Sequence, residues 1–276
     1  MGQKVAAGYS RLAREEGLPI LHIGPGLAGW ILRDKSLGEL QIELDRLKGP
    51  LSFDTGARVS VEINSQYNPR APAANVLAKW EGAVKGKEQE WVVIGAHRDA
   101  YGQHAGGLFF PGADDNASGS AVLLSLAKAL AKQAKTRPRG ILLVSFSGEE
   151  VGLLGARFLL SQPPVPLNKI AAMINIDAAG VGNGKITVGL GGLKREVVDR
   201  AVARQGIERG IEIFGYFPGG DHVPFHQQGI RTIVLTGSEA HPDMHQPSDS
   251  TEKIDPKLAA DIARLALGLV EELARR

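Results

Sequence analysis

The sequence predicts an α/β fold: a three-layer sandwich with a mixed, mostly parallel central sheet flanked by helices. Two observations predict it. From residue 91 onward, short apolar runs alternate with segments that have a helical pattern of apolar residues. The chain also has 276 residues, 43% of them hydrophobic, and 35 glycines that fall largely between the apolar runs. That composition is enough for a large core with many tight connections between strands and helices.

The elements follow in order along the second part of the chain. Strands are predicted at residues 75–82, 91–97, 141–148, 170–177 and 232–237. Helices are predicted at residues 117–134, within 150–160, at 193–206, and from Pro256 to the C-terminus. In an open sheet of this kind, ligand sites lie at the carboxyl ends of the strands, so the residues at those ends decide the function.

The first part of the chain is predicted to be a separate segment, residues 1–55, before a main domain at 56–276. It contains an expected helix at 8–16, a strand at 19–23 and a turn into a helix at 24–34. Gly24, Gly26 and Gly29 form a G-x-G-x-x-G pattern, which we interpret as a tight turn and not as a dinucleotide site, since a lone fingerprint is a weak signal. Residues 56–66 alternate as a strand would.

Composition excludes several classes of function. The formal net charge is +2 without a basic run, which gives no support for nucleic-acid binding. No apolar run approaches the roughly 18 residues of a membrane span. Cysteine is absent, so a metal would be held by histidine and carboxylate. The N-terminus lacks the apolar core of a secretory signal. The compartment is left open: exported if a further segment precedes this chain, and cytoplasmic otherwise.

Metal-type side chains stand where the apolar strands end. Zinc takes nitrogen from histidine and oxygen from carboxylates when thiolates are absent. Several carboxylates in one crevice repel one another unless cations lie between them. Two histidines with at least three carboxylates suffice for two metals that share a bridging carboxylate, and a further carboxylate is then available as a general base. The residues in these positions are His97, Asp99, Asp114, Asp115, Glu149, Glu150, Asp177 and His245.

Six motifs in this order resemble the co-catalytic dizinc exopeptidases. They are GAHRDAYG, PGADDNASG, SGEEVGLLG, INIDAAG, GGDHVPF and MHQPSDS, and they span roughly residues 70–276. That family includes the bacterial leucyl and aminoacyl aminopeptidases and glutamate carboxypeptidase II. The first motif is most similar to the glutamate carboxypeptidase and transferrin-receptor branch, and the second to the aminopeptidases.

The resemblance implies a ligand set of five residues for two Zn²⁺ ions per chain, with Co²⁺ or Mn²⁺ as other metals suited to such ligands. His97 and Asp177 are expected to bind one metal, and Glu150 and His245 the other. Asp115 is expected to bridge the two. His241 precedes His245 by four residues in a similar context, and the HQPSD wording favours His245.

The resemblance also implies the catalytic roles. Glu149 is expected to act as the general base, and Asp99 to orient His97. The peptide bond between Asp115 and Asn116 is expected to be cis, as in the family. Asp114 is expected to organise its loop or to bond to backbone groups.

His222 and Tyr216 are the expected residues for contact with the substrate or with the oxyanion of the tetrahedral intermediate. Residues 1–55 resemble the closing part of a protease-associated domain, the lid-like insert of this family.

The function expected from these residues is a zinc-dependent aminopeptidase, which removes N-terminal residues from peptides by a two-metal-activated hydroxide with a Glu general base. Three alternatives stay open: a glutamate-carboxypeptidase-like dipeptidase or carboxypeptidase, a protein like glutaminyl cyclase with one zinc, and a non-catalytic protein like the transferrin receptor. The expected partner is a peptide substrate, without nucleic acid or a membrane span, and a homodimer is allowed.

Overall fold

The structure is a computed structural model that describes residues 23–33, 35–62, 71–104, 107–133 and 137–275. The chain divides into two compact units, which are described separately. One comprises Met1–Ala71 with Gln103–Leu108, and the other comprises Pro72–Gly102 with Phe109–Arg276. The predicted division at residue 55, and the protease-associated character of the first segment, stay predictions.

The first unit contains two short helices, α2 (Pro25–Leu32) and α3 (Leu37–Leu47). Ser36 caps α3 by accepting a hydrogen bond from the Glu39 backbone N–H, and the Glu39 side chain returns one to Ser36. The helix expected within 24–34 is therefore present, whereas α3 was not predicted. The expected helix at 8–16 lies outside the described residues, as does the expected strand at 19–23 except for Ile23.

The expected strand at 56–66 is wrong over its described part, because residues 56–62 form no strand. Val59 and Val61, which gave the alternating pattern, are exposed. Alternation marks a chain that can form a strand, but a strand also needs a neighbouring chain to complete its hydrogen bonds. Residues 63–66 lie outside the described residues.

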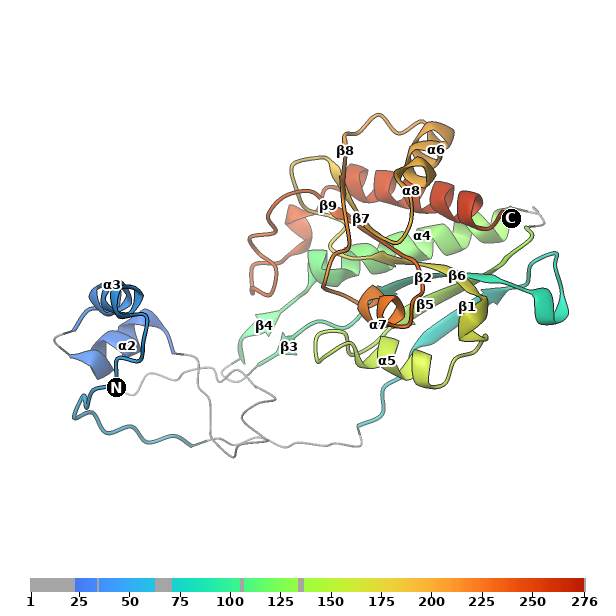
Figure 1. Cartoon of the computed structure of the whole chain (residues 1–276). Helices are drawn as coiled ribbons and strands as arrows, with labels where there is room; N and C mark the ends of the chain where they lie inside the picture. The colour runs from blue at the N-terminus through green and yellow to red at the C-terminus, as the bar shows by residue number, and fades with distance from the viewer. Residues whose placement is uncertain (1–22, 34, 63–70, 105–106, 134–136, 276) are drawn as a thin grey trace. The chain divides into compact units, whose positions relative to one another are not determined.

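A seven-stranded sheet forms the centre of the second unit, in the order β1-β5-β2-β6-β9-β7-β8 (Figure 1). Four of its six pairings are parallel, and β1–β5 and β7–β9 are antiparallel. The mixed, mostly parallel sheet predicted from the sequence is thus confirmed. The strands are β1 (Val76–Trp80), β2 (Trp91–His97), β5 (Gly140–Phe146), β6 (Ile170–Ile176), β7 (Ile186–Gly191), β8 (Ile211–Phe214) and β9 (Thr232–Gly237).

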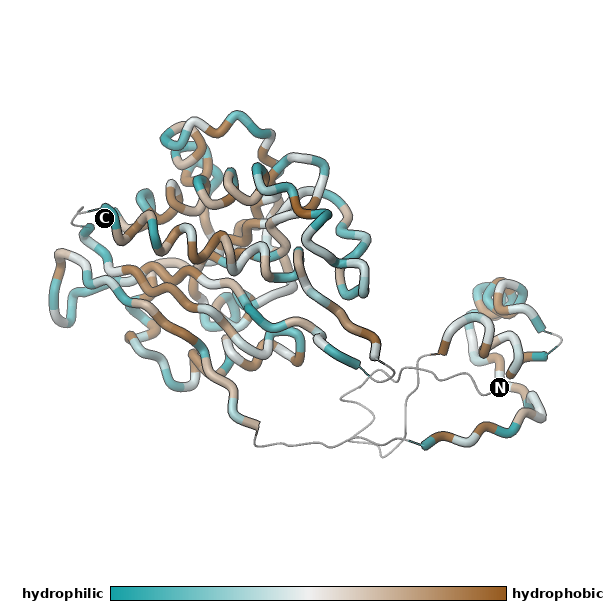
Figure 2. The backbone as a smooth tube through the Cα atoms, turned by 180° about the vertical axis from the view of Figure 1, so that it is seen from behind, coloured by the Kyte–Doolittle hydropathy of each residue, from teal (hydrophilic) through white to brown (hydrophobic). Residues whose placement is uncertain are grey.

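Helices cover both faces of this sheet (Figure 1). On one face lie α4 (Gly119–Lys132), α6 (Arg195–Gln205) and α8 (Pro256–Leu273); on the other lie α5 (Leu154–Ser161) and α7 (His222–Gln227). Alternate residues of one strand therefore enter different cores: Val92 and Ile94 pack towards α4 and α8, whereas Val93 packs towards α5 and α7. This is why the central strands are continuous apolar runs, the brown stretches of Figure 2.

Helix α4 begins at Gly119, two residues later than predicted, because an irregular turn precedes it. The turn spans Ala113–Ser118, and Asp115 and Asn116 within it have non-helical backbone angles. The peptide bond between them is cis, as expected. Helix α8 has a regular start: Asp255 caps it by accepting a hydrogen bond from the Lys257 N–H, with Pro256 at the first helical position.

Two strands of the sheet, β7 and β8, were not predicted. A further pair, β3 (Gly102–Gln103) and β4 (Phe109–Phe110), forms a separate two-stranded sheet. No helix in the described part of the chain is both long and apolar enough to cross a membrane.

Candidate metal centre

His97 is the last residue of β2, and its side chain is 1% exposed. Its Nε2 lies 3.2 Å from Asp115 Oδ1 and 3.2 Å from Asp177 Oδ1. Its Nδ1 lies 3.1 Å from the main-chain carbonyl oxygen of Asp99, whereas the Asp99 carboxylate is 3.8 Å away. The structure thus places Asp99 against His97, as expected, but the closer contact is through the main chain. The carboxylate of Asp99 accepts a hydrogen bond from the Glu150 backbone N–H at 3.2 Å.

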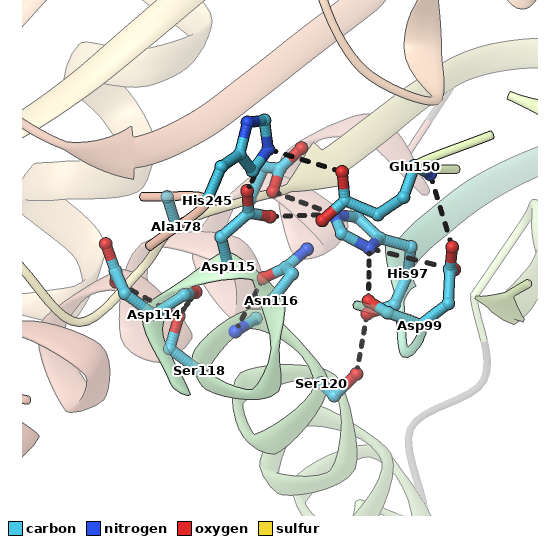
Figure 3. Close-up of polar contacts among 12 residues, drawn as sticks. His97, Asp99, Asp114, Asp115, Asn116, Ser118, Ser120, Glu150, Ala178 and His245 are labelled. Atoms are coloured by element: carbon cyan, nitrogen blue, oxygen red, sulfur yellow. Dashed lines mark hydrogen bonds and ion pairs between the residues drawn. The ribbon is translucent and has the colours of Figure 1, made fainter. Parts of the chain in front are cut away.

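Asp115 stands between the two histidines (Figure 3). One of its carboxylate oxygens faces His97, and the other lies 3.0 Å from His245 Nε2. The same His245 nitrogen lies 3.2 Å from Glu150 Oε2. The turn at Ala113–Ser118 contacts β2, and its Asn116 side chain donates a hydrogen bond to the Ile176 carbonyl oxygen at the end of β6. A carboxylate on this turn can therefore reach both sides of the site.

The structure therefore gathers the five predicted ligands into two groups that share Asp115. One group is His97, Asp115 and Asp177, and the other is Asp115, Glu150 and His245; within each, the donor atoms lie within 4.8 Å of one another. This is the partition expected from the motifs. Whether these residues bind metal stays a prediction at this point.

The carboxylates of the site are partly buried and lie close together, which disfavours their ionised forms. Burial, followed by the charges of Asp115 and Glu149, raises the pKa of Glu150 to about 8. Burial is also the main cause that raises the pKa of Glu149 to about 7. Burial alone would lower the pKa of His97, but its hydrogen bonds to Asp115 and Asp177, together with the charges of Asp177 and Glu149, raise the pKa to about 12. Cations between the carboxylates would remove this repulsion.

The donor distances fit a small divalent cation. Ligands on a tetrahedral zinc, with bonds of about 2.0 Å, lie roughly 3.3 Å from one another. The four measured distances between histidine nitrogen and carboxylate oxygen are 3.0–3.2 Å. The donor set, nitrogen with carboxylate oxygen and no thiolate, is also one that zinc accepts.

A cavity of about 610 Å³ opens beside both groups. Its floor is one face of β8, β7 and β9, whose residues line up in register: Phe214, Gly189 and Val234 form an apolar row, and Glu212, Thr187 and Thr236 form a polar row beside it. Phe217 and Met244 add apolar walls, and Glu149 also lines the cavity. The charged lining residues outside the two groups are Glu149, Glu212 and Glu239, and neither lysine nor arginine is among the described lining residues.

His222 and Tyr216, expected to contact the substrate, do not line this cavity. His222 is fully buried, and its Nε2 lies 2.7 Å from the Phe217 carbonyl oxygen. Tyr216 stacks on His226 with 4.1 Å between ring centroids. The structure brings the two side chains near each other, at 5.9 Å between centroids, and their role in substrate contact stays a prediction.

Sequence reasoning gave no role to Asp221, which precedes His222. Its side chain is fully buried, and burial raises its pKa to about 8. It also gave no role to Asp249, whose contacts with the site are described below. The only sign in the sequence that these two residues belong to the site is that they lie within its motifs, Asp221 in GGDHVPF and Asp249 in MHQPSDS.

Comparison with known proteins decides the family. The model of peptidase family M28 matches residues 75–270, which is most of the chain. The chain belongs to peptidase family M28. The family expected from the six motifs is thereby confirmed.

Curated relatives in this family are aminopeptidases. The chain is 27% identical over 272 residues to a probable leucine aminopeptidase of Arthroderma otae, covering 90% of this chain and 75% of that protein. It is 30% identical over 205 residues to one of Trichophyton verrucosum, covering 69% of this chain and 56% of that protein. The chain therefore spans little more than half the length of several relatives that it matches.

Solved structures confirm the fold. A zinc aminopeptidase from Bacillus subtilis superposes with a TM-score of 0.62 at 24% identity, over 73% of this chain and 50% of that one. An aminopeptidase from Aneurinibacillus sp. strain AM-1 gives a TM-score of 0.60 at 25% identity, over 73% of this chain and 48% of that one. The M28 sheet and its flanking helices are thus shared well beyond the fungal relatives.

Proposed function

We propose that this M28 peptidase is a metal-dependent aminopeptidase that removes the N-terminal residue from peptides. The observation that carries the proposal is the arrangement of five nitrogen and oxygen donors in two groups around Asp115, at the edge of a large cavity. The names of the relatives, leucine aminopeptidases and a zinc aminopeptidase, support the same activity.

Two Zn²⁺ ions are the proposed cofactors, with Co²⁺ or Mn²⁺ as substitutes that similar ligands accept. His97 and Asp177 would hold one ion, Glu150 and His245 the other, and Asp115 both. When bound, the ions would polarise the scissile carbonyl and lower the pKa of the attacking water.

Glu149 is the proposed general base. It lines the cavity but belongs to neither donor group, so its carboxylate is free to accept a proton. In the reaction it takes a proton from the attacking water and later gives a proton to the nitrogen of the leaving amine. Asp99 holds the ring of His97 through the contact at Nδ1, which leaves Nε2 directed at the two aspartates.

The charge of the cavity favours an amino terminus over a carboxyl terminus as the recognised end. Outside the donor groups its described lining has three acidic residues and neither lysine nor arginine. Glu149 and Glu239 carry the negative charge, while Glu212 is paired with Lys185 at 2.8 Å. A substrate ammonium group is attracted by such a lining, whereas a terminal carboxylate would be repelled. The side chain of the N-terminal residue is proposed to lie over the apolar row of Phe214, Gly189 and Val234.

The test is hydrolysis of aminoacyl-nitroanilides, of the same compounds with an acetylated amine, and of dipeptides that end in glutamate, each with and without a chelator. Chelator-sensitive cleavage of the free aminoacyl compounds alone is expected. Cleavage of the glutamate-ending dipeptides alone would move the chain to the carboxypeptidase alternative. One bound zinc with cyclase activity, or no bound zinc and no activity, would favour the other two alternatives. The homodimer stays a prediction, and the molar mass from light scattering would test it.

A further inference from the structure

The loop at residues 238–250, which follows β9, is called here the late loop. Three of its residues, spaced four apart, contact the pair Asp114–Asp115: His241, His245 and Asp249. His241 Nδ1 lies 2.5 Å from Asp114 Oδ2. His245 Nε2 lies 3.0 Å from Asp115 Oδ2. Asp249 accepts hydrogen bonds from the backbone N–H groups of both aspartates, at 2.8 and 3.1 Å. One loop is thus held to one dipeptide at three points, and the middle point is a proposed metal contact.

Asp249 is buried, with 2% of the residue exposed. A buried carboxylate is costly unless its oxygens accept hydrogen bonds. Here each oxygen has a separate backbone donor, and the Asp249 carbonyl oxygen also accepts a longer bond of 3.4 Å from the Ala113 N–H. These N–H groups begin the irregular turn before α4, where helical partners are lacking. Asp249 therefore fixes the backbone from which the Asp115 side chain extends.

Asp114 also contacts the loop after β6, which carries Asp177. Its Oδ1 accepts a hydrogen bond from the Gly180 N–H at 2.8 Å, three residues after Asp177. The side chain of Asp114 thus contacts both the loop after β6 and, through His241, the late loop. Three ligand-bearing segments meet at this residue, although it belongs to neither donor group.

His245 lies on an exposed turn, so its position depends on the contacts of the residues around it. Its side chain is 45% exposed, and its backbone has a φ of 58°, a conformation that residues other than glycine seldom adopt. It lies outside helices and strands, and its ring meets the edge of Tyr101 at 4.7 Å between centroids. Turn hydrogen bonds such as that from the Gln246 N–H to the Asp243 carbonyl oxygen shape this segment, and the contacts at residues 241 and 249 join it to Asp114–Asp115.

We propose that His241 and Asp249 are positioning residues for the second donor group. They hold the late loop on Asp114–Asp115 so that His245 Nε2 meets both Asp115 and Glu150, and in this way they set the affinity of that group for its cation. The inference rests on the metal binding of the proposed function. A merely structural role would lower the stability of the whole unit and affect both donor groups alike.

Zinc titration of the full chain tests this, with a chromophoric chelator as competitor and metal-stripped protein as the starting point. Asp249→Asn replaces one acceptor oxygen by an NH₂ group that faces a backbone N–H. We expect two zinc ions to bind the parent protein, and His245→Ala identifies which affinity belongs to the second donor group, because His245 belongs to that group alone. In Asp249→Asn that affinity should fall at least tenfold, and the other should stay within threefold of the parent. The matched control is Asp261→Asn on α8, which loses ion pairs with Arg209 and Arg264 away from the site. It should leave both affinities unchanged.

A second pair of variants separates positioning from folding. In His241→Asn the amide NH₂ takes the place of Nδ1 and still donates to Asp114, whereas His241→Ala offers no donor. Asn is expected to keep the zinc affinity of the second donor group within threefold of the parent, and Ala to lower it at least tenfold. Unchanged affinities in both Asp249→Asn and His241→Ala would overturn the proposal, and so would an equal loss at both sites. A parent chain that binds no zinc would overturn the proposed function itself.

Discussion

Glu150 Oε2 lies 3.2 Å from His245 Nε2, while the adjacent Glu149 lines the cavity and joins neither donor group. The two neighbouring carboxylates therefore have different surroundings, which agrees with one being a ligand and the other a base. We expect Glu149→Gln to lower kcat on leucyl-nitroanilide by about 10²- to 10⁴-fold. Zinc affinity, measured by chelator competition, should stay within threefold of the parent.

Glu150→Gln serves as the comparison for that variant, because it removes a donor and not the base. It should lose affinity for one zinc, and added zinc should restore part of its activity. A Glu149→Gln variant that keeps more than a tenth of the parent kcat would show that the base has been assigned to the wrong residue.

Gly189 sets the depth of the cavity floor. A Cβ atom built there would lie 3.3 Å from Phe217 Cβ and 3.6 Å from Val234 Cβ, so a methyl group fits with a small shift and a branched side chain fills the apolar row. We expect Gly189→Val to lower kcat/KM for leucyl- and phenylalanyl-nitroanilides about 10- to 100-fold relative to the alanyl compound. Gly215→Val is the control, because its Cβ would meet no atom within 4 Å. An unchanged preference in Gly189→Val would place the substrate side chain elsewhere.

Removing the metal should cost stability as well as activity. A ligand that binds only the folded state stabilises it by about 2.7 kcal/mol at a concentration of 100 times its Kd. For a chain of this size, that corresponds to a rise in Tm of roughly 5–10 °C. Calorimetry at pH 7.5 on chelator-treated protein, with and without zinc, measures it. His245→Ala should show a smaller rise, and equal Tm values with and without zinc in the parent would speak against a cation in the site.

Glu272 gives a pH dependence that is separate from the site. Its side chain is 8% exposed and lies 2.9 Å from Arg200 Nε and 2.5 Å from an Arg204 nitrogen. Burial alone would raise its pKa, but hydrogen bonds from Arg200 and Arg204 outweigh it and lower the pKa below 4.5. Because the folded pKa is the lower one, the ionised group stabilises the fold above about pH 4.5. That contribution is lost as the pH falls through the folded value.

Glu272→Gln should therefore lower the free energy of unfolding by about 1 kcal/mol at pH 7, and by progressively less as the pH falls below 4.5. Urea unfolding across this pH range measures the difference. The exposed Glu208, changed to Gln in the same way, should show little difference at any pH. A gap between Glu272→Gln and the parent that grows on acidification would contradict the assignment.

The donor residues could be predicted from the sequence because the ends of the apolar strands can be located in it. Each of β2, β5 and β6 is a continuous apolar run, and metal-type residues follow at or just beyond its carboxyl end. Strand β7 was missed because Gly189 and Gly191 interrupt its run of apolar residues, and β8 was missed because it has only four residues. Both are strands only by virtue of their partners in the sheet.

The contacts of Asp249 could not be predicted for a different reason. They join residues 134 and 135 positions apart, and the partners are backbone N–H groups, which every residue except proline carries. The residue types at the partner positions therefore give no sign of such a contact. Asp99 illustrates the same limit, because its closer contact with His97 is made through its main-chain carbonyl oxygen.

The place of β9 in the sheet has a consequence for the order in which this chain can fold during synthesis. Strand β9 lies between β6 and β7, so β7 and β8 join the sheet only after Thr232–Gly237 has been made. His245 follows a few residues later, and it completes the second donor group. Until β9 has been made, a growing chain can therefore join only β1, β5, β2 and β6 in this order, and until residue 245 has been made the second donor group lacks its histidine.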